Sequence, residues 1–574
     1  MFFSRHSSKI NDSKIALDSR IEVHDKSQFE VKFDYNFLNT TSKEEKYRRK
    51  KYSIEAYFFI PKNVGVSSIN YTKSQFYNDL HAYIRFQTPD MNFNEVNDDN
   101  NIHSPLRILK TNLEKLKVMN SEELDNISIT EAKLFGCLIN GFLKEGTKQI
   151  KRLINQATYY KNIANSQGFL NLIEKEIKTF INDTLAIYDK YRAIRREYEK
   201  LESLINQNII INLKLVDEYN TYRLENSFAV IHNEIETLTN LKDIDFKNVL
   251  DFIKDVASNE SKYRIEQNFI FFKNSTSVNY EYFSYRFSAI KKHIFQVLYL
   301  DIRHIKNEKK YKNMTAALGA GLAALMYMPA QWMITSKSQT GLSVLFMIII
   351  AYTFKDRLKE FSREFLFDKI LNRFHKYFPD NELFIQDYTQ DNGKKSIIGK
   401  CREYMKFLNK DSVEKDITKL RNLNHIVDID EEKYEEVIYY RKEVRLSSKR
   451  IANSHHRRTN IKDIIRFNIN EFLAKLDNPT GKINFYDIEK NIFSSLKAPK
   501  VYHLNIIFKY KIGDYNEPSY QRIRVVLDKN GIVRLEEVIP RSKFSLGMGK
   551  LIEEKMEEEI LSYNFDPENE SIIN

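Results

Sequence analysis

Few residue patterns in this 574-residue chain have the spacing that chemistry needs. The best match to a phosphate-binding loop is GAGLAA, Gly319 to Ala324, which fits the G-x-G-x-x-A pattern of dinucleotide-binding loops. Such a loop follows a β-strand and opens a helix whose N-terminus faces the pyrophosphate. The preceding residues, KNEKKYKNMTAAL, are charged and then small, which is not a strand pattern. We therefore exclude a nucleotide-binding loop here.

Candidate metal ligands are equally weak. One acidic stretch combines a histidine with three carboxylates, but it lacks the turn glycine and the closing bidentate acid of a calcium loop; its residues are His425, Asp428, Asp430 and Glu431. The adjacent His455 and His456 lack the i, i+4 spacing of a helical zinc pair. The sequence also lacks the H-E-x-x-H and G-x-S-x-G motifs. We expect no metal, no cofactor and no catalytic residue, and an enzyme is the less favoured class.

The best candidate contact site is a run of basic residues in the last third of the chain, made of Lys449, Arg450, Arg457 and Arg458. Clustered positive charge is attracted to lipid headgroups, to polyphosphates and to nucleic acid. A solvated turn is the simplest alternative, because the whole chain is basic, with a formal net charge of +12. Polyanion contact at these four residues is a hypothesis, and nucleic acid is possible but not the favoured partner.

The first hundred residues carry strand patterns. In FEVKFDYNF, five aromatic or branched residues from Phe29 to Phe37 alternate with polar ones, which is typical of a half-buried strand. KYSIEAYFFIP, ending at Pro61, follows the same period. We expect an N-terminal antiparallel β domain over residues 1–100.

A helical region is expected over residues 101–312. Apolar residues recur at alternating steps of three and four from Leu170 to Ile205, so residues 169–206 form a heptad-containing helix. The pattern leaves open whether this helix pairs inside its own chain or with a second chain.

The last third is expected to be α+β, with a helical segment over 355–430 and a C-terminal domain over 431–574. IKDIIRFNINEFLAKL places its apolar residues on one helical stripe, and VYHLNIIFKYKI alternates as a strand does. Asn530-Gly531 between two apolar runs is a hairpin signal. The sequence LIEEKMEEEILSYNF near the end predicts an acidic helix.

Two apolar stretches in the middle decide the fold class. Met314 to Ile334 contains no charge over a length that matches the hydrocarbon thickness of a bilayer, and Gly341 to Phe354 is a shorter second stretch. Basic residues flank the pair on its outer ends, while the loop between them holds only Lys337. This distribution predicts a two-helix transmembrane hairpin at 313–354 with both large domains on the cytoplasmic side.

Small residues at four-residue spacing line the first stretch, and they would let membrane helices pack closely. These residues are Ala316, Ala317, Ala320, Gly321 and Ala324. Packing between the two legs of the hairpin and self-association between protomers are both compatible with the spacing.

The sequence thus predicts an α+β membrane protein. Its central two-helix transmembrane hairpin is flanked by an N-terminal β-sheet plus helical region and by a C-terminal α+β domain with an antiparallel sheet. We expect a cytoplasmic (inner) membrane location with two spans and both termini cytoplasmic. The expected function is non-enzymatic sensing, scaffolding or effector action, with the lipid bilayer, an unknown cytosolic protein and a possible homo-oligomer as partners. The alternative is a membrane-anchored enzyme or binding protein that acts on nucleotides or nucleic acid through its basic C-terminal domain.

Overall fold

The computed structural model describes twelve stretches of the chain and scattered positions between 346 and 361. The stretches are 18–36, 49–89, 91–119, 121–159, 167–242, 246–270, 277–336, 379–387, 396–422, 435–454, 460–513 and 518–538. The acidic helix expected near the C-terminus lies outside the described residues, as do most of the second apolar stretch and the histidines His425, His455 and His456.

The strands are β1 (Asp18–Asp25), β2 (Gln28–Asn36), β3 (Arg49–Pro61), β4 (Leu80–Phe86), β5 (Asp301–Lys306), β6 (Asn381–Asp387), β7 (Ser396–Leu408), β8 (Glu435–Ser447), β9 (Asn460–Asn468), β10 (Thr480–Asp487), β11 (Ile492–Pro499), β12 (Tyr502–Ile512), β13 (Ser519–Asp528) and β14 (Gly531–Val538). The helices are α1 (Lys73–Asp79), α2 (Phe93–Asn97), α3 (Pro105–Leu116), α4 (Glu122–Tyr159), α6 (Gln167–Lys200), α7 (Gln207–Lys242), α8 (Lys247–Glu266), α9 (Ser277–Phe295), α10 (Glu308–Ser336), α12 (Lys415–Arg421), α13 (Ser448–Ser454) and α14 (Asn470–Leu473).

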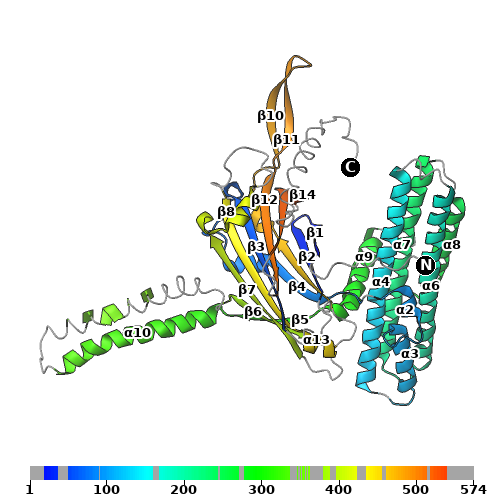
Figure 1. The fold of residues 1–574 in the computed structure, drawn as a ribbon, viewed down its shortest axis with the longest axis horizontal. Helices are drawn as coiled ribbons and strands as arrows, with labels where there is room; N and C mark the ends of the chain where they lie inside the picture. Colours follow the sequence, from blue (N-terminus) through cyan, green and yellow to red (C-terminus); the bar gives the residue numbers. More distant parts are fainter. Residues whose placement is uncertain are drawn as a thin grey trace.

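Within the described residues the strands form two packed sheets and a separate hairpin. The large sheet has eight strands in the order β14-β13-β12-β3-β8-β7-β6-β5, and the small sheet has the order β1-β2-β9-β4. Every neighbouring pair is antiparallel. The β10–β11 hairpin pairs with neither sheet and stands away from them (Figure 1).

Strands from the two ends of the chain are interleaved in both sheets. β2 pairs with β9 along its whole length, and β3 lies between β12 and β8. The expected ranges 1–100 and 431–574 therefore contribute strands to the same two sheets. The strands expected around Phe29, Tyr52 and Tyr502 are present as β2, β3 and β12, and the Asn530-Gly531 hairpin joins β13 to β14.

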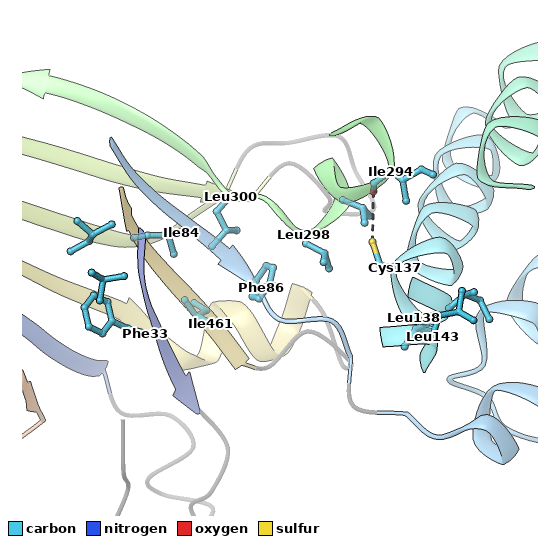
Figure 2. Packing of buried hydrophobic residues seen from close by; sticks show 14 of the residues in the cluster. Phe33, Ile84, Phe86, Cys137, Leu138, Leu143, Ile294, Leu298, Leu300 and Ile461 are labelled. Carbon is cyan, nitrogen blue, oxygen red and sulfur yellow. Dashed lines mark hydrogen bonds between the residues drawn. The ribbon is translucent and has the colours of Figure 1, made fainter. Parts of the chain in front are cut away.

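The inner faces of the two sheets and the helical bundle share one hydrophobic core. Leu298 and Leu300 connect Ile84 and Phe86 of β4 to Ile294 at the end of α9 (Figure 2). The thiol of Cys137 in α4 donates to the carbonyl oxygen of Ile294 at 3.8 Å. Burial of this continuous apolar surface ties the bundle to the sheets.

The heptad helix packs inside its own chain. α6 lies in the upright bundle beside α4, α7 and α8 (Figure 1). The seam residues Ile173, Ile177 and Tyr191 are each 0% exposed. Most seam residues are buried within this chain, and Leu170, Ile194 and Leu201 are half-buried, so the intrachain alternative accounts for the repeat.

A buried polar network joins α6, α7 and α8. The guanidinium of Arg192 donates two hydrogen bonds to Glu260, at 3.0 and 2.7 Å, and stacks 3.8 Å over the ring of Tyr263. Tyr263 in turn donates to Asp217 at 2.6 Å, and Arg195 lies 3.4 Å from the same carboxylate. Burial nevertheless raises the pKa of Asp217, and the two arginines oppose that effect.

One expected helix is a strand. We predicted a helical stripe from Ile461 to Leu476, but residues 460–468 form β9 and only the short α14 follows. β9 is the inner strand between β2 and β4, and it buries Ile461, Ile465 and Phe467 on one face, at 0%, 2% and 0% exposed. Ile464 on the other face is also buried, so the apolar residues do not alternate strictly and can also be placed on a helical stripe.

The expected transmembrane hairpin, and with it the membrane fold class and the inner-membrane location, is wrong. No helix among the described residues is both long enough and apolar enough to cross a bilayer. Met314–Ile334 lies in α10, which has 29 residues but opens with the polar run EKKYK. Thr315, Pro329 and Gln331 further interrupt its apolar residues. The length of α10 therefore matches a transmembrane span, but its hydrophobicity is lower than membrane insertion needs.

α10 instead forms an arm that extends away from the sheets (Figure 1). The arm is inserted between the neighbouring strands β5 and β6, and the backbone N–H of Asn307 donates to the carbonyl oxygen of Asp380 at 3.1 Å at its base. Asp380 also accepts hydrogen bonds from Lys73 and from Tyr77, both at 3.0 Å. The arm is thus fixed at its root to the large sheet and to α1.

Candidate polyanion interface

The large sheet has two chemically different faces because its side chains alternate along every strand. In β8, Ile438 and Tyr440 point into the core, whereas Tyr439 and Arg441 point to the outer face. The same alternation in β3 and β7 places charged residues on the outer face.

A short helix covers one end of this outer face. Ile417 of α12 packs with Tyr57, Tyr439 and Ile507 in a small second core. Arg421 at the end of α12 donates to Glu435 of β8 at 2.6 and 3.1 Å in a buried pair. The other end of the face, beside β5, β6 and α13, is where basic residues gather.

Cations from four strands, together with one aromatic residue, stand in register on that end. Arg303 of β5 opposes Phe384 of β6, which opposes Lys400 of β7. Lys400 opposes Arg445 of β8, and Arg445 opposes Lys51 of β3. We call these five residues the basic row. Since neighbouring strands lie ~4.8 Å apart, the row spans about 19 Å.

The next row holds the counter-charges, and they are too few. Glu382 lies 2.9 Å from the Lys400 ammonium and 3.4 Å from the Arg402 guanidinium. Glu443 is shared among three cations, with Arg445 at 2.7 Å, Lys51 at 3.3 Å and Arg441 at 3.4 Å. Each acid therefore neutralises part of two or three cations, and this end of the face keeps a positive excess.

The pKa of Glu443 records that excess. Partial burial works to raise the pKa of its carboxyl, but the hydrogen bond from Arg445 and the charge of Lys51 outweigh burial. The pKa of Glu443 is consequently below its ordinary value of 4.5.

Positive charge also extends under α12. Burial, followed by repulsion from Arg421 and Arg524, lowers the pKa of the Arg522 guanidinium to about 9.

The cations of the basic row are accessible. The side chains of Arg445, Lys51 and Lys400 are 51%, 44% and 34% exposed. The ammonium of Lys400 lies 5.3 Å from the centre of the Phe384 ring, so the aromatic face and the cation form one contact point. In the described part of the chain no carboxylate pairs with Arg303.

Two of the four residues predicted for polyanion contact lie next to the basic row. Lys449 and Arg450 are exposed on α13, which follows β8 directly, and Arg450 donates a hydrogen bond to the carbonyl oxygen of Ile397 in β7. Arg457 and Arg458 lie outside the described residues. Lys449 and Arg450 therefore adjoin the basic row at the end of β8.

The sequence did not predict the residues of the basic row, because they come from strands that are far apart in the chain. Once the strands are known, charged residues can be seen to recur between apolar ones in three of them, KKYSIEAY, GKCREYMKF and YRKEVRLS. Register between strands cannot be read from one strand alone.

The small residues singled out in the sequence all lie on α10. Ala316 and Ala320 are half-buried, while Ala317, Gly321 and Ala324 are exposed. A side chain added at Gly321 would meet no atom within 4 Å. Gly319 is likewise inside the helix, so GAGLAA is not a loop between a strand and a helix.

The described residues show neither a candidate metal site nor a disulfide bond. They contain no group of three histidine, cysteine or acidic side chains placed to hold a metal ion. Both cysteines, Cys137 and Cys401, are buried and unbridged. No family model matches the sequence, and neither a curated protein nor a solved structure is similar to it.

Proposed function

We propose that this chain is a non-enzymatic binding protein whose ligand is single-stranded nucleic acid, held on the outer face of the large sheet. The observation that carries the proposal is the basic row, in which Arg303, Phe384, Lys400, Arg445 and Lys51 stand in register across five neighbouring strands. Lys449 and Arg450 extend the same positive surface onto α13.

The geometry favours an extended polyanion over a small anion. A single phosphate needs convergent donors in a cradle, whereas these cations are spread along about 19 Å of an open face. A flexible phosphodiester strand can follow such a line and release its counterions as it binds. Phe384 within the row offers a ring for base stacking, which every base allows. The surface therefore fits binding with little sequence preference.

The test is the affinity of a labelled oligonucleotide of about 20 nucleotides, longer than the ~4–16 nucleotides of typical single-strand sites. The test variant combines Lys51→Gln, Lys400→Gln and Arg445→Gln. Its control removes the same charge from the helical bundle with Lys117→Gln, Lys151→Gln and Lys200→Gln, at side chains that are 40%, 51% and 69% exposed.

We expect the row variant to bind at least about tenfold more weakly at fixed salt. Its plot of log affinity against log salt should also be shallower by about two, since each lost phosphate contact removes about 0.7 from the slope. The control variant should keep the parent slope. Equal losses in the two variants would show that binding follows net charge and not the row, which would refute the proposal.

A further inference from the structure

We infer that the acidic segment 551–570 of this same chain occupies the basic row when nucleic acid is absent, so that the chain regulates its own binding surface. The inference rests on the proposed function only in that both ligands use the same face. Residues 539–574 follow β14 in the sequence and lie outside the described part of the structure.

The segment has the charge that the row lacks. Between Leu551 and Glu570 the sequence carries eight carboxylates and a single lysine, Lys555. Ile552, Met556, Ile560 and Tyr563 recur at steps of four, four and three, which predicts one apolar stripe on a helix. The acids Glu553, Glu554, Glu557 and Glu558 fall beside that stripe. The segment is thus an acidic amphipathic helix in its sequence pattern.

The outer face of the large sheet offers both cations and exposed apolar side chains. The basic row and Arg402 supply cations that share only Glu382 and Glu443 among the described residues. Apolar side chains lie beside the row, where Ile305 is 38% exposed and Ile397 is 40% exposed. An acidic helix with an apolar stripe can satisfy both features together, whereas a purely polar chain satisfies only the first.

The chain between the sheet and the segment is long enough. β14 ends at Val538, which is in register with Arg522, Ile507, Tyr57 and Tyr439 across the sheet. Arg445 lies six residues further along β8 than Tyr439, about 20 Å, and β8 lies four strands from β14, about 19 Å. The direct path is therefore about 28 Å, while the twelve residues 539–550 reach up to about 40 Å when extended.

Tethering makes a weak contact sufficient. Individual exposed ion pairs contribute little to affinity. A tethered segment, however, has an effective concentration in the millimolar range, so modest affinity fills the site. A nucleic acid strand with more charges, present in solution, then displaces the segment.

Zero-length carbodiimide cross-linking of the full chain tests the contact without nucleic acid. The reagent joins a carboxylate to a lysine amine as an amide, with the water taken up by the carbodiimide. We expect amides between acids of 553–559 and Lys51, Lys400 or Lys449 within monomeric chains, and their loss when the oligonucleotide is added. Cross-links from these acids only to other lysines, or only between chains, would overturn the inference.

The affinity measurement gives an independent result. The variant Glu553→Gln, Glu554→Gln, Glu557→Gln and Glu558→Gln should bind the oligonucleotide about tenfold more tightly if the segment covers about nine-tenths of the molecules. The control changes four exposed acids of the helical region, Glu114, Glu197, Glu202 and Glu236, to Gln. Equal affinities of the two variants would overturn the inference. Cross-links that form in a chain unable to bind the oligonucleotide would instead refute only the proposed function.

Discussion

Lys442 of β8 and Asp463 of β9 connect the two sheets through their core, with the ammonium 2.6 Å from the carboxylate oxygen and both side chains 1% exposed. Tyr52 of β3 donates a second hydrogen bond to the same carboxylate at 2.8 Å. β8 and β9, which are close in the sequence, thus meet β3 from the other end of the chain at one buried charge pair. An unpaired charge at this depth is costly, so the pair fixes how the sheets face each other.

Lys442→Met should lower the free energy of unfolding by about 3–5 kcal/mol, because Asp463 would remain buried without its cation. The double variant Lys442→Met with Asp463→Leu should lose less than the single variant, since neither charge is then left alone. Urea denaturation of the three chains measures both effects. A double variant that loses as much as Lys442→Met or more would contradict a coupled pair.

The same pair gives a signed pH dependence. Burial works to lower the pKa of Lys442, but the charge of Asp463 outweighs it and the pKa is raised above the ordinary 10.5. A raised lysine pKa stabilises the fold fully below the unfolded value and loses that contribution as pH rises through the folded value. Stability should therefore fall above about pH 10.5 in the parent chain more steeply than in Lys442→Met.

Gly146 and Gly168 offer a matched test of the bundle packing. A Cβ at Gly146 of α4 would lie 2.1 Å from Cε2 of Phe180 in α6, whereas a Cβ at Gly168 would meet no atom within 4 Å. Gly146→Ala should destabilise the chain by about 1–3 kcal/mol through overpacking. Gly168→Ala should stabilise it by up to about 1 kcal/mol through helix propensity. Equal thermal midpoints for the two variants would mean that α4 and α6 do not pack closely at Phe180.

Glu443→Gln should strengthen binding of the oligonucleotide by about twofold to tenfold, because it removes an acid that Lys51, Arg441 and Arg445 now share. The same change should alter acid stability. Because the folded pKa of Glu443 is below 4.5, its carboxylate stabilises the fold above that value and the contribution is lost as pH falls below it. Denaturation between about pH 6 and about pH 3 should show a smaller decrease for the variant. Weaker binding by Glu443→Gln would contradict the role given to the row.

Trp332 reports on the arm. It is the single tryptophan of the chain, and its side chain in α10 is 73% exposed. We expect its fluorescence to resemble that of indole in water and to be quenched readily by iodide, with Trp332→Phe as the blank. Blue-shifted emission that iodide cannot reach would show that another surface covers this part of α10.

Local sequence patterns predicted the helices and strands whose conformation depends least on distant parts of the chain. The alternation from Phe29 to Phe37 and around Tyr502 sufficed for β2 and β12, and the heptad sufficed for α6. Long-range contacts decided the rest. β9 is a strand because β2 and β4, from the other end of the chain, pair with both of its edges. Its apolar residues, taken alone, can also be placed on a helical stripe.

The basic residues on α13 and the basic row differ in how far the sequence could predict them. The cluster at Lys449 and Arg450 is contiguous in the sequence and could be predicted, whereas Arg303, Lys400 and Lys51 are brought into one row only by the register of five strands. The transmembrane prediction weighed length and flanking charge above apolarity. α10 has the length, but its polar residues remove the hydrophobicity that a span needs.

Photo-cross-linking locates the ligand most directly. An oligonucleotide of about 20 nucleotides that carries photoreactive bases is bound to the full chain, irradiated and mapped by mass spectrometry. The basic row predicts cross-links in β6 at Phe384 and in the neighbouring peptides of β5, β7 and β8. Cross-links confined to the helical bundle or to the β10–β11 hairpin would contradict nucleic acid binding on the large sheet.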